Sequence, residues 1–226
     1  QRDNNRVAIF FIDLDGFKNV NDTFGHAKGD MLLKLTTERI KESVRKADTV
    51  SRLSGDEFAI ILSGDNDVFS FEKIASQILD KIAKPFHLIE IEAYVTASIG
   101  ISIFPDDGST YEELLSKADS AMYKAKEKGK NNVQFFTKEM DIKAQQRRHL
   151  EVELRKVIVN KELILHYQPI HQVSSNKVVS AEALVRWLHP IKGLVPPADF
   201  IALAEDIGFI TEIGDWVLEE ACKQAK

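Results

Sequence analysis

The chain has 226 residues, with 30 Lys and Arg against 35 Asp and Glu, and a formal net charge of −5. That length allows one large domain or one and a half ordinary ones. The acidic balance argues against a nucleic-acid coat, which needs a basic face, so we expect no nucleic-acid partner. The single cysteine, Cys222, cannot form an internal disulfide, which fits a reducing, cytoplasmic setting.

The first 136 residues alternate between strand and helix patterns. The continuous apolar run 7–12 is typical of a strand buried on both faces, and Thr110 with Glu113 forms a capping box that opens a helix. We expect Gly16–Phe24 to turn the chain, Gly100 to mark a bulge, and Gly129 to end the last helix. Strands are expected at 7–12, 50–53, 58–62, 86–91, 94–104 and 133–136, and helices at 27–45, 69–83 and 110–129.

This order, β-α-β-β-α-β with one extra strand, predicts an α/β (α+β) fold of the ferredoxin-like type over residues 1–136. A charged segment with an apolar stripe follows, and predicts a connector helix at 137–161. Residues 162–226 begin a second domain, with strands at 163–169 and 178–185 and helices at 197–207 and 211–226. Strand–strand–helix–helix is not a complete fold, so we expect this domain to be truncated.

The chain is also expected to be cut from a longer protein, because residue 1 falls just before a core strand. No apolar run approaches the ~20 residues of a membrane span, and no signal peptide is visible. Whether the parent protein is anchored to a membrane stays open.

Two acidic clusters each adjoin an apolar run. Asp13 and Asp15 follow the first strand, and Asp56 and Glu57 lie in a predicted hairpin turn. If these strands are neighbours, the carboxylates converge on one edge and repel unless a cation lies between them. Oxygen ligands of this kind suit Mg²⁺ or Mn²⁺ and the phosphates that these ions carry.

The residues after the first cluster offer contacts for a nucleotide. Free N–H groups at Phe17 and Lys18 could hold a phosphate where a helical turn begins. Asn21 and Asp30 offer an amide and a carboxylate, and a carboxylate can accept from N1–H and the exocyclic amine of guanine, whereas adenine leaves it unpaired. The alternative for Asp30 is that it only caps the following helix.

Two further groups carry charge near predicted turns. Lys126 and Lys130 are four residues apart, so they share a face if the helix persists, either to bind phosphate or only to complement the helix dipole. Arg45 and Asp48 precede the hairpin, where an arginine could grip a phosphate or guanine edge, or form only a surface ion pair.

Three ordered blocks resemble the GGDEF domain of diguanylate cyclases and cover residues 6–136. They are DLDGFKNVNDTFGH at 13–26, SGDEF at 54–58, and ADSAMYKAK at 118–126 followed by Gly129-Lys130-Asn131. The resemblance implies a nucleotidyl-cyclase palm that binds GTP. It further implies that two GTP are joined into cyclic di-GMP with release of pyrophosphate, the 3′-hydroxyl of one attacking the α-phosphate of the other. Because one domain holds one GTP, catalysis implies a homodimer.

The resemblance also implies roles for individual residues. Asp13, Asp56 and the Leu14 carbonyl would hold the metal, with Asp13, Asp56 and Glu57 as the catalytic set and Glu57 near the attacking hydroxyl. Asn21 and Asp30 would read guanine. Lys126 and Lys130 would hold the triphosphate. Arg45 and Asp48 would form an inhibitory site for the product cyclic di-GMP.

The chain departs from the family pattern at two of these positions. Ser54 replaces the first glycine of the signature, which carries a cost if that position needs a positive φ or close nucleotide approach. Lys130 stands where arginine is usual in the family. A lysine keeps the positive charge but cannot donate two parallel hydrogen bonds to a phosphate as a guanidinium group does. The family's segment before the first strand is also absent. Some relatives keep the domain only as a GTP sensor, so a regulatory GTP-binding module is the alternative function.

The second unit resembles the start of an EAL domain, a cyclic di-GMP phosphodiesterase built as a TIM-like barrel. The matching segments include YQPI at 167–170, AEALVRW at 181–187 and IGDWVL at 213–218. The resemblance implies that Glu182 is a metal ligand and that Gln168 and Arg186 touch substrate; otherwise, Arg186 would be the ion partner of a Glu182 buried in its strand. A barrel needs ~250 residues, so this part alone is expected to hydrolyse nothing.

Overall fold

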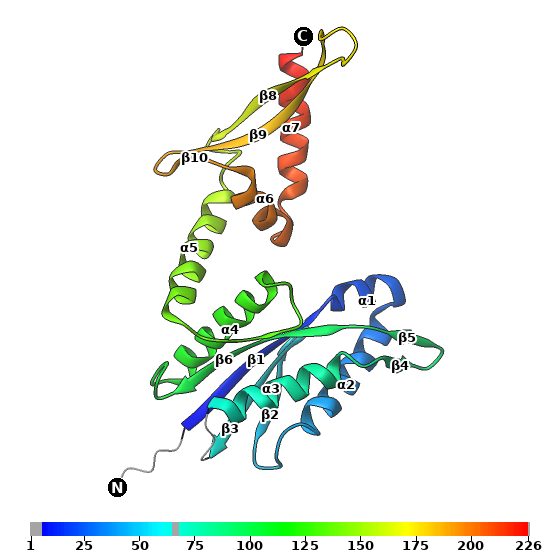
Figure 1. Ribbon diagram of the computed structural model, residues 1–226, viewed down its shortest axis with the longest axis vertical. Helices are drawn as coiled ribbons and strands as arrows, with labels where there is room; N and C mark the ends of the chain where they lie inside the picture. Colours follow the sequence, from blue (N-terminus) through cyan, green and yellow to red (C-terminus); the bar gives the residue numbers. More distant parts are fainter. Residues whose placement is uncertain (1–5, 65–67, 226) are drawn as a thin grey trace. The chain divides into compact units, whose positions relative to one another are not determined.

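A computed structural model of the chain describes residues 6–64 and 68–225. The chain divides into two compact units, Gln1–Ile142 and Lys143–Lys226, each described here by itself (Figure 1). The domain boundaries at 136 and 161 stay predictions. No helix in the described part of the chain is long and apolar enough to cross a membrane.

A five-stranded sheet in the order β2-β3-β1-β6-β7 forms the centre of the first unit. β1 pairs antiparallel with β3 on one side and β6 on the other, and β7 runs parallel to β6. This order confirms the predicted ferredoxin-like arrangement with one extra strand. The strands are β1 Arg6–Asp15, β2 Thr49–Ser54, β3 Glu57–Gly64, β6 Thr96–Phe104 and β7 Val133–Phe135.

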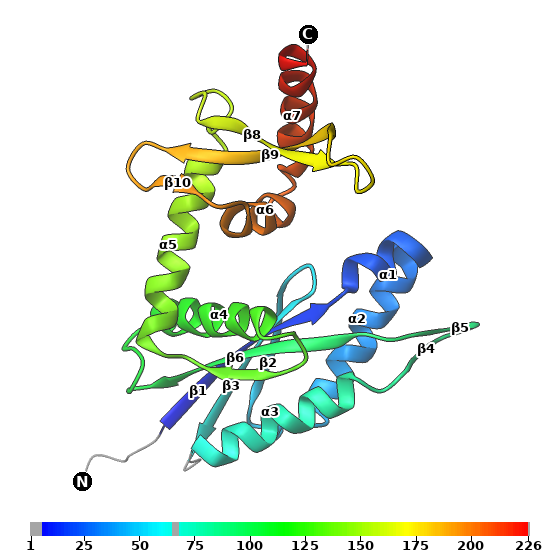
Figure 2. The same ribbon diagram turned by 45° about the horizontal axis from the view of Figure 1, so that its top comes forward.

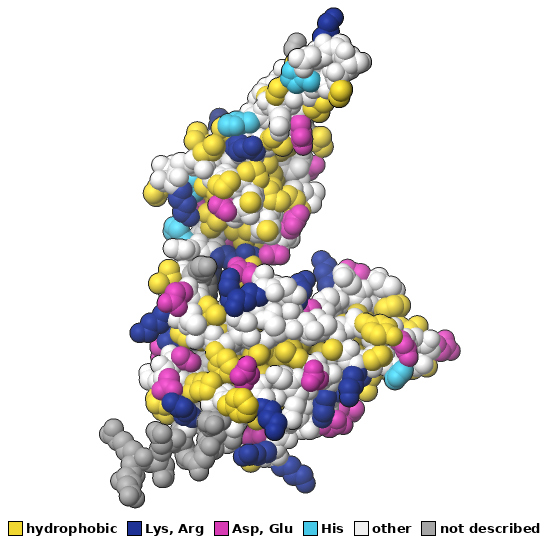
Figure 3. All heavy atoms as spheres, viewed as in Figure 1, with side chains coloured by type: hydrophobic (Ala, Val, Ile, Leu, Met, Phe, Trp, Pro, Cys, Tyr) yellow, Lys and Arg dark blue, Asp and Glu magenta, His cyan; other side chains and the backbone are white. Residues whose placement is uncertain are grey.

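Helices cover both faces of this sheet, with α4 on one face and α2 and α3 on the other (Figure 1). Phe10 and Ile12 of β1 join the larger core, which α2 and α3 share, while Ile9 and Phe11 pack with α4. Charges of both signs are interspersed over the visible face of this unit, with no single basic patch (Figure 3). The helices are α1 Phe17–Phe24, α2 His26–Lys41, α3 Val68–Ile82 and α4 Tyr111–Glu127.

Two segments differ from the sequence-based expectation. Residues expected to turn the chain form the helix α1, because Gly16 takes φ 80 as its N-cap and Phe17 and Val20 are buried on one face. The strand expected at 86–91 breaks at Ile89, which has φ 68, and gives a separate hairpin of β4 Phe86–Leu88 and β5 Ile91–Ala93 that projects past the main sheet (Figure 2). A β-branched residue in that conformation is rare, so the sequence carried no turn signal there.

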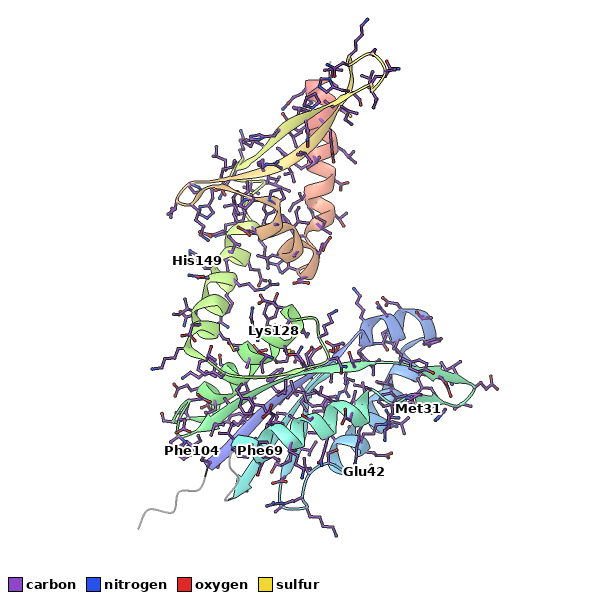
Figure 4. All side chains as sticks on the ribbon, viewed as in Figure 1. Met31, Glu42, Phe69, Phe104, Lys128 and His149 are labelled. Atoms are coloured by element: carbon purple, nitrogen blue, oxygen red, sulfur yellow. The ribbon has the colours of Figure 1, made fainter. Side chains whose placement is uncertain are left out.

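The second unit packs its own core. α5 Lys138–Leu154 is shorter than the expected connector helix, and His149 lies along it (Figure 4). The apolar stripe ends in a core where Leu154 and Val157 are fully buried with Trp187 and Phe200. The remaining elements are β8 Leu163–His171, β9 Val178–His189, β10 Gly193–Val195, α6 Pro197–Asp206 and α7 Ile210–Gln224, with the strands in one antiparallel sheet of order β10-β9-β8.

Gly100 is not a bulge but a point of close approach between β6 and α4. It pairs in unbroken register with Phe11 of β1. A Cβ at this position would lie 1.9 Å from the carbonyl oxygen of Ala118 and 2.1 Å from the amide nitrogen of Met122. Both are backbone atoms of a packed helix, so only glycine lets α4 sit this close to the sheet.

Gly100→Ala should therefore destabilise the first unit by about 1–3 kcal/mol, the usual cost of forcing extra volume into a packed interior. Urea unfolding followed by circular dichroism measures this. The matched control is Gly108→Ala, whose Cβ would meet only side-chain atoms of Glu113, at 3.0–3.2 Å, and no backbone of a packed helix. Equal stability of Gly100→Ala and the unmutated chain would contradict the close approach.

Candidate active site at the end of strand β1

The turn between β2 and β3 lies directly over the end of β1. Asp13 is in register with Glu57, and the Leu14 amide donates to the Asp56 carbonyl oxygen at 3.3 Å. Gly55 takes φ 42 in this turn. The structure therefore brings the two acidic clusters together at one edge of the sheet.

Asp13 is the most buried carboxylate of the site and is paired with a lysine. Its exposed fraction is 8%, and Lys126 Nζ of α4 lies 2.8 Å from its Oδ2 atom. Burial raises the pKa of Asp13 above its ordinary value. The hydrogen bond and charge of Lys126 lower this pKa in part, whereas the negative charges of Asp56 and Asp15 add to the rise.

The predicted ligands at this edge are all oxygen atoms, which is the kind of ligand that a hard divalent cation binds. Among the described residues, no three His, Cys, Asp or Glu side chains are gathered as a metal cage. The predicted set instead has two carboxylates, Asp13 and Asp56, and the Leu14 main-chain carbonyl, with phosphate and water left to complete the shell. That composition is typical of Mg²⁺ sites, which use one or two carboxylates together with substrate phosphates.

Ser54 holds Glu57 rather than straining the hairpin. Its hydroxyl donates to Glu57 Oε2 at 2.6 Å, while Arg52 Nε donates to the Gly55 carbonyl oxygen at 2.8 Å. The left-handed residue of the turn is Gly55, and Ser54 is not in that region. The conformational cost considered for serine is therefore absent, and the side chain instead bonds directly to a predicted catalytic carboxylate.

The start of α1 presents backbone donors beside the acidic edge. Gly16 is the N-cap without any side-chain cap, and the first amide bonded inside the helix is that of Asn19, which donates to the Gly16 carbonyl oxygen at 3.0 Å. The amides of Phe17 and Lys18 precede it and have no acceptor within the helix. Because the Phe17 side chain is buried in the core, only its backbone is available to a phosphate, whereas Lys18 is exposed.

Asn21 and Asp30 come from the neighbouring helices α1 and α2. Asn21 Oδ1 is buried with no hydrogen-bond partner in the described part of the chain, and a Cβ on Gly29 would lie 1.9 Å from it. Gly29 thus makes room for Asn21, a role that a glycine inside a helical pattern could have signalled. The N-cap of α2 is Gly25, so the alternative that Asp30 caps this helix is wrong. Asp30 is exposed, and guanine reading by this pair stays a prediction.

Lys126 and Lys130 do not share a helix face. Their spacing predicted a shared face only if the helix continued as far as Lys130, and it does not. α4 ends at Glu127, and Lys128, labelled in Figure 4, is its C-cap. The Lys130 amide donates to the Ala125 carbonyl oxygen and the Gly129 amide to that of Lys126, which is a Schellman termination. Lys130 is therefore exposed beyond the helix, with φ 62.

Asp15 anchors the segment that follows α4, and the sequence-based prediction missed this role. Its carboxylate accepts from the hydroxyls of Thr96 at 2.7 Å and Ser98 at 2.9 Å, and from the Asn131 amide at 3.2 Å. These donors come from β6 and from the loop that carries Lys130. Asp15 thus fixes that loop against the sheet, and no local sequence signal joins the three segments.

The other two predicted sites are placed as follows. The Asp48 carboxylate accepts from the Arg45 amide at 2.8 Å and so closes a turn, while the Arg45 side chain is exposed. In the second unit Gln168 of β8 lies opposite Glu182 of β9. Glu182 is exposed in this unit, and its role as a metal ligand stays a prediction. The Arg186 guanidinium donates to the Val185 carbonyl oxygen at 2.8 Å, and no ion pair joins it to Glu182 in the described part of the chain.

Comparison with known protein families matches both halves of the chain. The family model of the diguanylate cyclase GGDEF domain matches residues 1–132, and that of the EAL domain matches residues 151–226. The chain therefore belongs to the GGDEF family. Within it, the chain joins a GGDEF domain to the beginning of an EAL domain.

Similar proteins of known name align with nearly the whole of this chain, across both matched domains. The bifunctional diguanylate cyclase/cyclic di-GMP phosphodiesterase MucR of Pseudomonas aeruginosa is 43% identical over 225 residues, which are 100% of this chain and 33% of MucR. The cyclic di-GMP phosphodiesterase NbdA of the same species is 41% identical over 97% of this chain and 28% of its own length. The chain thus spans about a third of the length of these relatives.

Solved structures resemble the first unit. A structure of an EAL/GGDEF domain protein from M. capsulatus is 48% identical, with a TM-score of 0.57 over 61% of this chain and 88% of that one. The GGDEF domain of PA1120 from Pseudomonas aeruginosa is 34% identical, with a TM-score of 0.58 over 60% and 84% of the two chains. The fold of the first unit is therefore that of a GGDEF domain.

Asp15→Ala should lower the free energy of unfolding of the first unit by about 2–3 kcal/mol, because it removes a charged acceptor from three donors. Urea denaturation measures this loss. Asp15→Asn is the matched control: it keeps an acceptor oxygen for the Asn131 amide and a donor for a hydroxyl, so it should retain most of the stability. An Asp15→Ala chain as stable as Asp15→Asn would contradict the anchoring role.

Proposed function

We propose that the first unit condenses two GTP into cyclic di-GMP and two pyrophosphates. The observation that carries this proposal is the placement of Asp13, Leu14, Asp56 and Glu57 at one sheet edge, with Lys126 and the start of α1 beside them. Carboxylates for a cation, backbone and lysine donors for phosphates, and a further carboxylate near the reacting groups are what nucleotidyl transfer requires.

Each residue has a role in this proposal. Asn21 and Asp30 bind guanine, and the amides of Phe17 and Lys18 bind phosphate. Lys126 and Lys130 bind the triphosphate, and Glu57, held by Ser54, lies near the attacking 3′-hydroxyl. Asp13, Asp56 and the Leu14 carbonyl hold Mg²⁺ or Mn²⁺, which supplies positive charge to the triphosphate; domains of both families generally depend on a divalent metal.

Two such units must meet, because each offers one guanine site and the reaction consumes two nucleotides. In each of the two steps a 3′-hydroxyl gives up its proton and its oxygen bonds to the α-phosphorus of the facing nucleotide. The bond from that phosphorus to pyrophosphate breaks, and pyrophosphate leaves. We further propose that the product binds at Arg45 and Asp48, and that an EAL domain completed in a longer protein hydrolyses it with Glu182, Gln168 and Arg186 at its site.

A regulatory role is the second candidate for the same unit. In this version the GGDEF unit binds GTP, forms no product and tunes the attached phosphodiesterase. The observation that favours it is that similar proteins such as NbdA of Pseudomonas aeruginosa and PdeR of Escherichia coli are named as phosphodiesterases alone. The two candidates share the GTP site and differ in whether product appears.

The unmutated chain should convert GTP to cyclic di-GMP with Mg²⁺ or Mn²⁺, at a rate that rises faster than linearly with protein at low concentration. Asp56→Ala should reduce the rate by a hundred- to a thousand-fold, since the charge stabilisation lost is on the order of several kcal/mol. Chromatography of the products measures both effects.

Asp106→Ala is the matched control, because this carboxylate pairs with Arg6 at the opposite end of β1. It should leave the rate unchanged. Retained synthesis in Asp56→Ala would refute the metal role. GTP binding without product in the unmutated chain would favour the regulatory candidate.

GTP should bind more tightly than ATP, because the Asp30 carboxylate can pair with guanine and not with adenine. Asp30→Ala should remove about 1.5–3 kcal/mol of this preference, the range for a hydrogen bond to a charged group. Calorimetry with each nucleotide measures the difference. Glu38→Ala, on the same helix and also exposed, is the control and should keep it. Equal affinities for GTP and ATP in the unmutated chain would contradict guanine reading.

A further inference from the structure

The contact between Lys126 and Asp13 joins two rigid elements of the first unit. β1 is hydrogen-bonded to a strand on each side, and α4 is anchored by fully buried residues such as Ala118 and Ala125. The Lys126 side chain is 31% exposed and that of Asp13 is 12% exposed. This pair is therefore built into the fold, unlike an ion pair between two mobile surface side chains.

The pair compensates negative charge that gathers at the end of β1. Asp13 is buried, and the charges of Asp56 and Asp15 lie close enough to disfavour its ionised form. The ammonium group of Lys126, 2.8 Å from Oδ2, is the positive charge that compensates it. A divalent cation bound to the same carboxylate would lie close to this ammonium, and two cations on one carboxylate repel each other.

We propose that Lys126 is an internal counter-ion of the cation site, which holds Asp13 while no nucleotide is bound and moves to the triphosphate when a nucleotide enters. The inference rests on the proposed function, since it assigns how that site is regulated. A long lysine side chain on the last turn of α4 has the freedom for this exchange, and the triphosphate supplies the negative charge that draws it away.

The consequence is that metal and nucleotide bind with positive coupling. Without nucleotide, the cation must displace the ammonium from Asp13, so metal binding is weak. With nucleotide, the ammonium has a new partner and Asp13 is free for the metal. Because coupling between two ligands is reciprocal, the metal also tightens nucleotide binding. A purely structural ion pair would give no such dependence on Lys126.

The test is Mn²⁺ binding to the full chain without nucleotide, followed by the electron paramagnetic resonance signal of free Mn²⁺. Lys126→Met should bind Mn²⁺ at least about tenfold more tightly than the unmutated chain, within the usual range of coupling between sites. Adding a GTP analogue whose α,β-bridge cannot be cleaved should tighten Mn²⁺ binding in both chains, because its phosphates also bind Mn²⁺. The tightening should be about tenfold greater in the unmutated chain than in Lys126→Met, which has no ammonium to displace.

Lys124→Met is the matched control, because it removes the same charge from the same helix but breaks only the pair with Glu127. Its Mn²⁺ affinity without nucleotide should equal that of the unmutated chain. Lys126→Gln is the second variant, for use if Lys126→Met does not fold, and should show the same tightening. Both variants are checked by circular dichroism.

Three outcomes overturn the inference in distinguishable ways. If the unmutated chain binds Mn²⁺ with the GTP analogue but Lys126→Met and Lys126→Gln bind Mn²⁺ alone no better, the counter-ion role fails and the proposed function stands. If Lys124→Met tightens Mn²⁺ as much as Lys126→Met, the effect is only one of net charge. If no chain binds Mn²⁺ even with the analogue, the metal site of the proposed function fails as well.

Discussion

The burial of β1 on both faces is the constraint on which the site depends. The strand is apolar from Val7 to Ile12, with its side chains divided between the core shared by α2 and α3 and the core under α4. A strand that is apolar on both faces has no in–out alternation to fix its register. The polar end of β1 fixes the register instead. The Leu14 amide donates to the hairpin, and the Asp15 carboxylate accepts from β6 and from the loop after α4.

The same polar end has to accommodate several carboxylates in a small space. Three of them have separate partners: Asp13 a lysine, Asp15 two hydroxyls and an amide, and Glu57 the Ser54 hydroxyl. These partners differ in whether they can move away and leave the carboxylate free to bind a ligand. The donors of Asp15 belong to the sheet and a fixed loop, so Asp15 is structural. Lys126 and Ser54 are side chains that can move without disturbing a strand, which leaves Asp13 and Glu57 available to a ligand.

The sequence predicted the parts of this site that follow from local pattern. Apolar runs gave the strands, the Ser-Gly-Asp-Glu turn gave the hairpin, and together they predicted that Asp13 and Asp56 converge. The capping box at Thr110 is present, with its side chain accepting from the Glu113 amide at 3.2 Å. What could not be predicted depends on distant segments: the close packing at Gly100 requires α4 to be in place, and the partners of Asp15 come from β6 and from the loop after α4.

The end of α4 shows why spacing alone misleads. Four residues equal one helical turn, so the positions of Lys126 and Lys130 predict a shared face only while the helix continues. Gly129 ends it, and Lys130 follows with a left-handed backbone that lysine rarely adopts. The glycine was visible in the sequence as a helix end, but where the chain goes next is set by the Asn131 amide on Asp15. Strain of this kind persists only when surrounding contacts hold it.

The hairpin bears most directly on the choice between an enzyme and a regulatory module. A serine in the first position of the signature would count against catalysis if it needed a left-handed backbone, but the left-handed residue is Gly55. Ser54 still pairs with Glu57, and the register of β2 shifts between Arg52 and Ser54. The effect of Ser54 is therefore chemical: its hydroxyl occupies one oxygen of Glu57 and fixes that carboxylate. Such a bond can orient Glu57 toward a nucleotide or hold it back. The choice between the two proposed functions therefore depends on how this one hydrogen bond places the Glu57 carboxylate.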